Sequence, residues 1–212
     1  VNEPFHLDNP NIVWLVESGK LALFAIKIQH GSNNGQRRYL CSVSTGEALF
    51  PQTLLAETIT PRQWIFEAVA VESAQLAQLS MNDLLQRINA RDDTAITLVE
   101  KWVHHLNQVV QKQQTLLVMP LNLNQTTDEQ SFSLAAGEEL QLRQKTLCWV
   151  KLQQGITQWL GIEELKLTPD SPAFPFTCAT WLEAKNSVTG VMLLTWELEQ
   201  AELLAGLTNL HN

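Results

Sequence analysis

The feature that most constrains the fold is a succession of short apolar segments, rich in β-branched and aromatic residues and separated by turn residues. The first segment runs from Ile12 to Ile28, and Ser18-Gly19 interrupts it, which predicts two strands joined by a tight turn. Residues 31–35 are predicted to form a loop at a hairpin end. Thr45-Gly46-Glu47 predicts another turn. Further strands are predicted at 38–43, 64–71 and 76–79. Many short strands with regular turns are typical of a β-sandwich or jelly roll.

The hydrophobic period then changes to that of a helix. Met81-Asn82-Asp83 is predicted to cap a short helix, and Asp92-Asp93 to begin a longer one. In the longer segment, apolar residues recur at steps of three and four in two adjacent stripes. The stripes are Ile96, Val99, Val103, Leu106 and Val110, and Leu98, Trp102, His105 and Val109. So broad a face predicts contact with both its own barrel and a partner helix or second domain.

A chain of 212 residues is long enough for two domains of about 100 residues each. We predict a β-roll with C-terminal helices over 1–115, a linker over 116–131, and a second, degenerate β-roll with a C-terminal helix over 132–212. In the second domain, strands are predicted at 176–182 and 188–198, a helix at 199–211, and loops around Pro169, Pro172 and Pro175. The predicted class is mainly β with α: two tandem jelly-roll domains joined by an α-helical segment.

The two halves share a sparse internal repeat. The matched pairs are Glu3 with Glu138, Leu7 with Leu142 and, loosely, Trp14 with Trp149, all 135 residues apart. If the offset is increased by one residue, Gly19 pairs with Gly155. This register suggests a duplicated fold.

Composition excludes several classes of function. The net charge is −8, and only 14 Lys and Arg residues are spread along the chain, which argues against a nucleic-acid-binding protein. Cys41, Cys148 and Cys178 cannot all pair, so we interpret them as buried thiols in a reducing compartment. No apolar run approaches the ~20 residues needed to cross a bilayer. The start at Val1 suggests a segment of a longer protein or a processed start.

No pattern of catalytic or metal-binding residues stands out. The five histidines show no ligand spacing, and neither a Gly-x-Ser-x-Gly elbow nor a phosphate-binding Gly-rich loop with Lys is found. Glu138-Glu139 and Glu163-Glu164 are interpreted as solvated charge rather than an acid–base pair. We therefore predict a non-catalytic chain with no metal site and no cofactor.

The first half resembles the cyclic nucleotide-binding domain in its order of strands, Gly-Glu turn, Thr60-Pro61-Arg62 element, strand and helices. In that family a Gly-Glu pair holds the ribose, and an Arg holds the cyclic phosphate. Aligned on Arg62, Pro51-Gln52 stands where the Gly-Glu pair is expected, and Gly46-Glu47 lies further upstream. Proline lacks an amide donor and glutamine lacks the carboxylate, so the usual ligand is not expected. The ligand-binding candidates that this resemblance gives are Arg62, Gln52 and Glu47.

A second resemblance covers most of the chain. The matching segments are 7–28, 35–50, 64–73, 147–161, 174–184 and the final Leu207 to Asn212. They resemble the N-terminal region of NHLM/NHLP-type bacteriocin-export ABC transporters, a cyclic-nucleotide-domain-like region that precedes the membrane helices and the ATPase. The resemblance implies a cytosolic regulatory or docking domain, tethered to the inner membrane in its parent. The implied partners are the membrane and ATPase domains and the leader peptide of the cargo, and a dimeric transporter would imply a homodimer.

Three alternative functions make different demands on the sequence. A small-ligand sensor would bind a cyclic nucleotide or another anion at Arg62. A transcription factor of the catabolite-activator type would need a basic helix-turn-helix where the second β-rich segment stands. A cupin-like metalloenzyme fails on the histidine pattern.

For the docking function, the predicted interface residues are Trp102, Val103, Val110, Trp196, Leu203 and Leu207. An aromatic ligand cage is the alternative role for the seven tryptophans.

Overall fold

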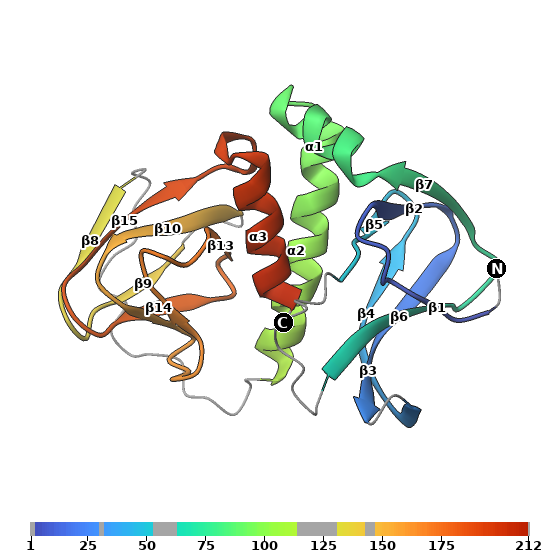
Figure 1. Ribbon diagram of the computed structural model, residues 1–212, viewed down its shortest axis with the longest axis horizontal. Helices are drawn as coiled ribbons and strands as arrows, with labels where there is room; N and C mark the ends of the chain where they lie inside the picture. The colour runs from blue at the N-terminus through green and yellow to red at the C-terminus, as the bar shows by residue number, and fades with distance from the viewer. Residues whose placement is uncertain (1–2, 30–31, 53–62, 114–130, 143–146, 212) are drawn as a thin grey trace. The chain divides into compact units, whose positions relative to one another are not determined.

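The computed structural model describes residues 3–29, 32–52, 63–113, 131–142 and 147–211 (Figure 1). This part of the chain is mainly β, with antiparallel sheets and three α-helices, as the composition of the segments predicts. Its contacts divide the chain into unit 1, residues 1–106 with residue 211, and unit 2, residues 107–210 with residue 212. Within the described residues, no helix is both long enough and apolar enough to span a membrane.

Where the structure describes unit 1, it forms two antiparallel sheets and two helical segments. The strands are β1 (Phe5–His6), β2 (Ile12–Ser18), β3 (Lys20–Gln29), β4 (Ser32–Ser44), β5 (Ala48–Leu49), β6 (Gln63–Ala70) and β7 (Gln75–Ser80). One sheet has the order β1-β6-β3-β4 and the other the order β5-β2-β7. Apolar residues of β2, β3 and β6, such as Val13, Leu23 and Ala68, are completely buried and form its core.

Gly19 is a corner between the two sheets, and the tight turn predicted there is wrong. Strands β2 and β3 belong to different sheets and do not pair with each other. Gly19 has a φ of +86°, and a Cβ atom at this position would lie 2.4 Å from the carbonyl oxygen of Ser73. Glycine is therefore required twice, by its left-handed backbone and by the close approach of the neighbouring chain.

The hairpin between β3 and β4 is tighter than the sequence suggested. Gln29 pairs with Ser32, so β4 already includes most of the predicted loop at 31–35. The strand predicted at 38–43 is the second half of β4. The strands predicted at 64–71 and 76–79 correspond to β6 and β7 within one residue at each end.

Two helices follow β7. Helix α1 (Met81–Asn89) is capped by Ser80, whose hydroxyl accepts a hydrogen bond from the Asp83 amide at 3.4 Å. The cap therefore lies one residue before the predicted 81–83. Helix α2 (Asp93–Gln113) begins as predicted, because Asp92 accepts hydrogen bonds from the Thr94 and Ala95 amides. The hydrogen bond from Arg87 to Asp92 holds the pKa of that carboxyl below its usual range.

The described residues of unit 2 form eight strands and a C-terminal helix. The strands are β8 (Ser131–Leu134), β9 (Glu139–Gln141), β10 (Cys148–Gln154), β11 (Thr157–Trp159), β12 (Lys166–Leu167), β13 (Phe174–Phe176), β14 (Trp181–Ala184) and β15 (Val188–Leu193). A 3-10 helix, η1 (Thr195–Glu197), and helix α3 (Gln200–His211) complete it. The sheets have the orders β13-β10-β15-β8 and β12-β11-β14-β9 (Figure 1).

Two sequence predictions in unit 2 need correction. The strand predicted at 176–182 is two strands, because Thr177 and Thr180 close a turn between them: the Thr180 amide donates to the Thr177 carbonyl at 3.0 Å. Pro175 lies in β13 rather than in a loop, opposite Trp149, on an edge strand that tolerates the missing donor. The strand predicted at 188–198 ends at Leu193, where η1 follows.

The strand order of unit 2 is that of a jelly roll. Numbered in chain order, its strands run 6-3-8-1 in one sheet and 5-4-7-2 in the other. The described strands of unit 1, numbered as the second to the eighth, run 2-7-4-5 and 6-3-8. Both units therefore follow one order, and only the first strand has no counterpart among the described residues of unit 1.

The strand registers extend this match to single residues. Phe5 faces Ala68 in unit 1 as Leu140 faces Leu182 in unit 2, an offset of 135 residues between β1 and β9. Both units have a corner glycine, because a Cβ at Gly155 would lie 2.3 Å from a carbonyl oxygen, that of Ser187. The corresponding offset between β2 and β10 is 136 residues.

The pairing of Trp14 with Trp149 in the sequence repeat is wrong by one residue. With the offset of 136 that the corner glycines fix, Trp14 corresponds to Val150, and Trp149 corresponds to Val13. Because side chains alternate along a strand, one residue of slip moves a side chain to the opposite face of the sheet. Trp149 and Val13 are both completely buried, as this assignment requires.

Candidate functional site

Two of the three ligand-binding candidates, Gln52 and Glu47, lie in the described residues, and the role of all three in ligand binding stays a prediction. Arg62 lies outside the residues that the structure describes. Gln52 is 5 % exposed, and its amide side chain is engaged: Nε2 donates to the Trp64 carbonyl at 3.0 Å, and Oε1 accepts from the Phe66 amide at 3.0 Å. Gln52 thus provides a hydrogen-bond donor and an acceptor for the backbone of β6.

Glu47 has a structural role in the Gly-Glu turn. Its carboxylate accepts a hydrogen bond from the Ser44 amide at 2.8 Å and lies 3.2 Å from the imidazole of His105. The same turn recurs in unit 2, where Glu138 accepts from the Ala135 amide at 2.7 Å. In each unit, the glutamate of one Gly-Glu pair therefore closes a turn by accepting a backbone hydrogen bond.

The predicted interface residues are mostly buried. Trp102, Val103, Leu203 and Leu207 are at most 4 % exposed, whereas Val110 and Trp196 are half-buried. Trp102 contacts the rings of Phe50 and Phe66, and Val110 packs against the core of unit 2. Their role at an interface stays a prediction.

No group of three or more His, Cys, Asp or Glu residues that could hold a metal ion occurs in the described part of the chain. Three histidines are accounted for: His6 and His105 each face a carboxylate, and His104 has an interaction within the chain. Cys148 is buried, which raises the pKa of its thiol to about 12. The absence of a catalytic function, metal or cofactor stays a prediction.

Unit 1 contains an open pocket with a volume of about 630 Å³. Strand β1 contributes Phe5 and His6, β2 contributes Trp14 and Glu17, and β7 contributes Gln75 and Leu76, with Ala74 directly before it. Strand β2 pairs with β7 in one sheet, and β1 is an edge strand of the other sheet. A volume of this size is in the range of small-molecule and cofactor pockets.

The pocket is apolar at its wall and polar at its rim. The rings of Phe5 and Trp14 contact edge to face, with centroids 5.4 Å apart and an interplanar angle of 62°. Glu17 and Gln75 are both exposed and add a carboxylate and an amide. An aromatic wall with a few polar groups is suited to hold an apolar group in a fixed orientation.

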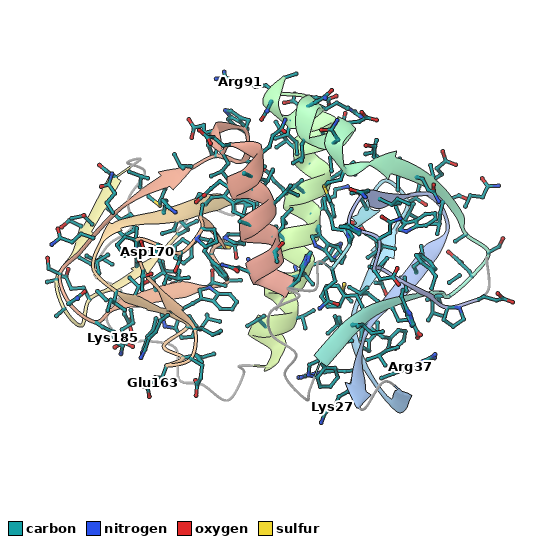
Figure 2. All side chains as sticks on the ribbon, in the orientation of Figure 1. Lys27, Arg37, Arg91, Glu163, Asp170 and Lys185 are labelled. Carbon is teal, nitrogen blue, oxygen red and sulfur yellow. The ribbon has the colours of Figure 1, made fainter. Side chains whose placement is uncertain are left out.

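The buried carboxylate of Glu67 faces His6, one of the residues that line the pocket. Glu67 is 3 % exposed in the middle of β6, where its carboxylate lies 2.9 Å from the guanidinium of Arg37 and 3.5 Å from the imidazole of His6. A buried carboxylate needs such partners, because its desolvation is costly without them. Figure 2 labels Arg37 among the side chains of unit 1. Glu67 therefore links Arg37 to His6.

The sequence analysis missed this site. The one signal for Glu67 was its position as the single charged residue within the apolar run 64–71. The pocket itself joins residues from three separate segments, and no local pattern marks them.

The sequence matches no family model and no curated protein. Solved structures with some similarity include cAMP-bound PfPKA-R (13% identity, TM-score 0.29, covering 92% of this chain and 69% of that chain). Another is the regulatory domain of Toxoplasma gondii PKA with cAMP, at 13% identity and a TM-score of 0.25, covering 99% of this chain and 81% of that chain. A third is a cupin 2 conserved barrel domain protein from Leptotrichia buccalis, at 9% identity and a TM-score of 0.20, covering 91% of this chain and 76% of that chain. At such TM-scores these similarities carry no argument about this chain.

Proposed function

We propose that this chain is a non-catalytic docking and regulatory module of a bacterial peptide-export ABC transporter. In this proposal it lies in the cytoplasm and is tethered to the inner membrane through the parent protein. Its partners are the membrane and ATPase domains and the leader peptide of the cargo, and it acts as a homodimer. The support comes from the sequence segments that resemble the N-terminal region of these exporters.

The proposal includes a finer statement of the fold. Two cyclic-nucleotide-binding-domain-like rolls stand in tandem, with the helical segment that includes α2 between them. The shared strand order and the two corner glycines, Gly19 and Gly155, support this duplication. Such rolls can serve as scaffolds for recognition when the nucleotide cassette is lost.

The observation that carries the proposal is the pocket of unit 1. Its aromatic wall of Phe5 and Trp14, with Glu17 and Gln75 at the rim, fits an apolar side chain of a peptide. The nucleotide-binding mode receives no such support, since Gln52 and Glu47 are both engaged in hydrogen bonds within the fold.

Isothermal titration of the purified chain tests the proposal. The probes are a bacteriocin leader peptide, cyclic AMP and cyclic GMP, with Trp14→Ala and the exposed-rim variant Glu17→Ala as pocket variants. We expect the peptide to bind, both pocket variants to weaken its binding, and Arg62→Ala to have no effect. Absence of peptide binding at millimolar concentration would overturn the docking function. Cyclic nucleotide binding that Arg62→Ala abolishes would establish the sensor alternative instead.

A further inference from the structure

The pocket of unit 1 combines an aromatic corner with a negative charge. The rings of Phe5 and Trp14 meet edge to face, with centroids 5.4 Å apart, so they form a corner rather than a flat stack. The face of an aromatic ring carries partial negative charge. A cation close to such a corner is attracted by the rings, whereas an uncharged group of the same shape gains only the packing.

Glu17 brings its carboxylate to the same pocket through a β-bulge. Trp14 and Glu17 are three residues apart, so regular alternation would place them on opposite faces of β2. The pairing of β2 with β7 passes from Val16 directly to Ser18, which makes Glu17 the extra residue of a bulge. The bulge interrupts the alternation, and Trp14 and Glu17 both line the pocket.

Glu17 supplies the negative charge of the pocket without a competing cation in the described lining. Its side chain is exposed, and no ion pair joins it to another described residue. The lining contains no Lys or Arg among the described residues, and the imidazole of His6 lies 3.5 Å from the carboxylate of Glu67. The net charge of −8 adds a field that attracts cations to the chain.

Unit 2 has neither the aromatic corner nor the carboxylate at the equivalent positions. The offset of 135 between β1 and β9, and that of 136 between β2 and β10, give the equivalent residues Leu140, Val150 and Gln153. Unit 2 keeps the bulge, because the pairing of β10 passes from Leu152 to Gln154. The bulge therefore does not require a glutamate, and the three groups suited to a cation occur together in unit 1.

We propose that the pocket of unit 1 binds a cationic side chain, Lys or Arg, of the partner peptide. The apolar stem of that side chain packs against Phe5 and Trp14, and its charged end lies at the carboxylate of Glu17. Long cationic side chains combine an apolar stem with a charged end in this way. This inference rests on the proposed docking function, and it names the chemistry of the side chain that the same pocket takes.

NMR titration with three short peptides tests the preference for a cation. The acetylated and amidated peptides Gly-Ser-X-Ser-Gly contain lysine, norleucine or glutamate at X, so they differ in one side chain. The indole N–H resonance of Trp14, assigned by its loss in Trp14→Phe, reports binding in the pocket. We expect the lysine peptide to bind about tenfold more tightly than the norleucine peptide, because only lysine adds the attraction to the rings and the carboxylate. The glutamate peptide should bind most weakly.

The same titrations separate failure of this inference from failure of the docking function. Equal binding of the lysine and norleucine peptides would overturn the preference for a cation, although the docking function would stand. If no peptide shifts the Trp14 resonance at high millimolar concentration, the inference is overturned, and binding of the leader peptide then decides the docking function separately.

Glu17→Gln removes the charge of the pocket and keeps the shape of the side chain. It should weaken the lysine peptide several-fold and leave the norleucine peptide unchanged. Glu72→Gln, at an exposed position outside the lining, makes the same change in net charge and is the matched control, with both affinities expected to stay the same. An equal loss in the two variants would assign the effect to the overall charge and overturn the role of Glu17.

Charge reversal provides a gain of binding that a misfolded chain would not show. Glu17→Lys should make the glutamate peptide the tightest ligand of the three, and circular dichroism checks the fold of the variant. An unchanged order of the peptides would overturn the placement of the charged end at Glu17. The free amine n-butylammonium, which has the stem and charge of lysine, tests the source of the cation. Binding as tight as that of the lysine peptide would assign the pocket to free amines and overturn the peptide as its ligand.

Discussion

Glu139 and Glu183 face each other directly across the antiparallel pair β9 and β14. Partial burial of Glu139, and then the nearby charge of Glu183, raise the pKa of the Glu139 carboxyl above its usual value. We expect Glu139→Gln to raise the free energy of unfolding at pH 7 by about 0.2–1 kcal/mol, since like charges directly opposite are destabilising.

This effect should depend on pH with a defined sign. A carboxyl with a raised folded-state pKa contributes stability below its unfolded pKa of about 4.5 and loses it as pH rises through the folded value. The gain from Glu139→Gln should therefore disappear in urea titrations below about pH 4.5. Glu164→Gln, at an exposed position with the same charge change, is the control and should show a smaller effect.

Cys148 provides a second test at the residue scale. Because burial raises the pKa of its thiol to about 12, almost no thiolate is present at pH 8. We expect iodoacetamide to leave Cys148 unmodified in the folded chain and to modify it in urea, as mass spectrometry of the peptides would show. The half-buried Cys178 should react faster than Cys148. Equal rates would contradict the buried placement.

At the scale of elements, helix α3 packs closely on the sheet of unit 2 at Gly206. A Cβ atom there would lie 2.4 Å from the Ala173 carbonyl oxygen and 2.7 Å from the ring of Trp149. Glu202 also ties the helix to β10 through Lys151, at 3.0 Å, and accepts from the Ala173 amide at 2.6 Å.

Gly206→Ala should therefore destabilise the chain, although Gly to Ala within a helix normally stabilises by about 1 kcal/mol. We expect a loss of about 1–3 kcal/mol in unfolding free energy, from overpacking against Trp149. Asn209→Ala on the exposed side of the same helix is the control and should be neutral or slightly stabilising. A stabilised Gly206→Ala variant would show that α3 stands further from the sheet.

At the scale of the whole molecule, the two units share one jelly-roll order and one kind of corner. Gly19 and Gly155 have φ values of +86° and +88°, and both lack space for a Cβ atom. Gly46 and Gly137 have similar φ values, +78° and +81°, but among the described residues no atom lies within 4 Å of where their Cβ atoms would stand. Substitutions at the four glycines can therefore separate the cost of a left-handed backbone from the cost of a steric clash.

We expect Gly46→Ala and Gly137→Ala to cost about 1–2 kcal/mol each, the usual penalty of a left-handed residue. Gly19→Ala and Gly155→Ala should cost about 1–3 kcal/mol more, because a neighbouring carbonyl must also move. Chemical denaturation measures all four. Equal costs at all four positions would contradict the corner geometry, and unequal costs at Gly19 and Gly155 would contradict their equivalence.

The sequence by itself determined the elements whose pattern is local. Strand β6 and helix α3 were predicted within one residue at each end, because apolar alternation and helical spacing are properties of neighbouring residues. The offset of 135 between Glu3 and Glu138 likewise required only the order of residues. The predicted domain boundaries at 115 and 131 stay predictions.

Tertiary structure decided how these elements pair and what they leave open. A glycine turn at Gly19 is compatible with a hairpin or a corner, and only the position of Ser73 from another strand selects the corner. Gln52 was a ligand candidate from its place in the chain, but the strand beside it uses both ends of its amide. The pocket beside Trp14 joins residues of β1, β2 and β7, segments far apart in the sequence that no local pattern can bring together.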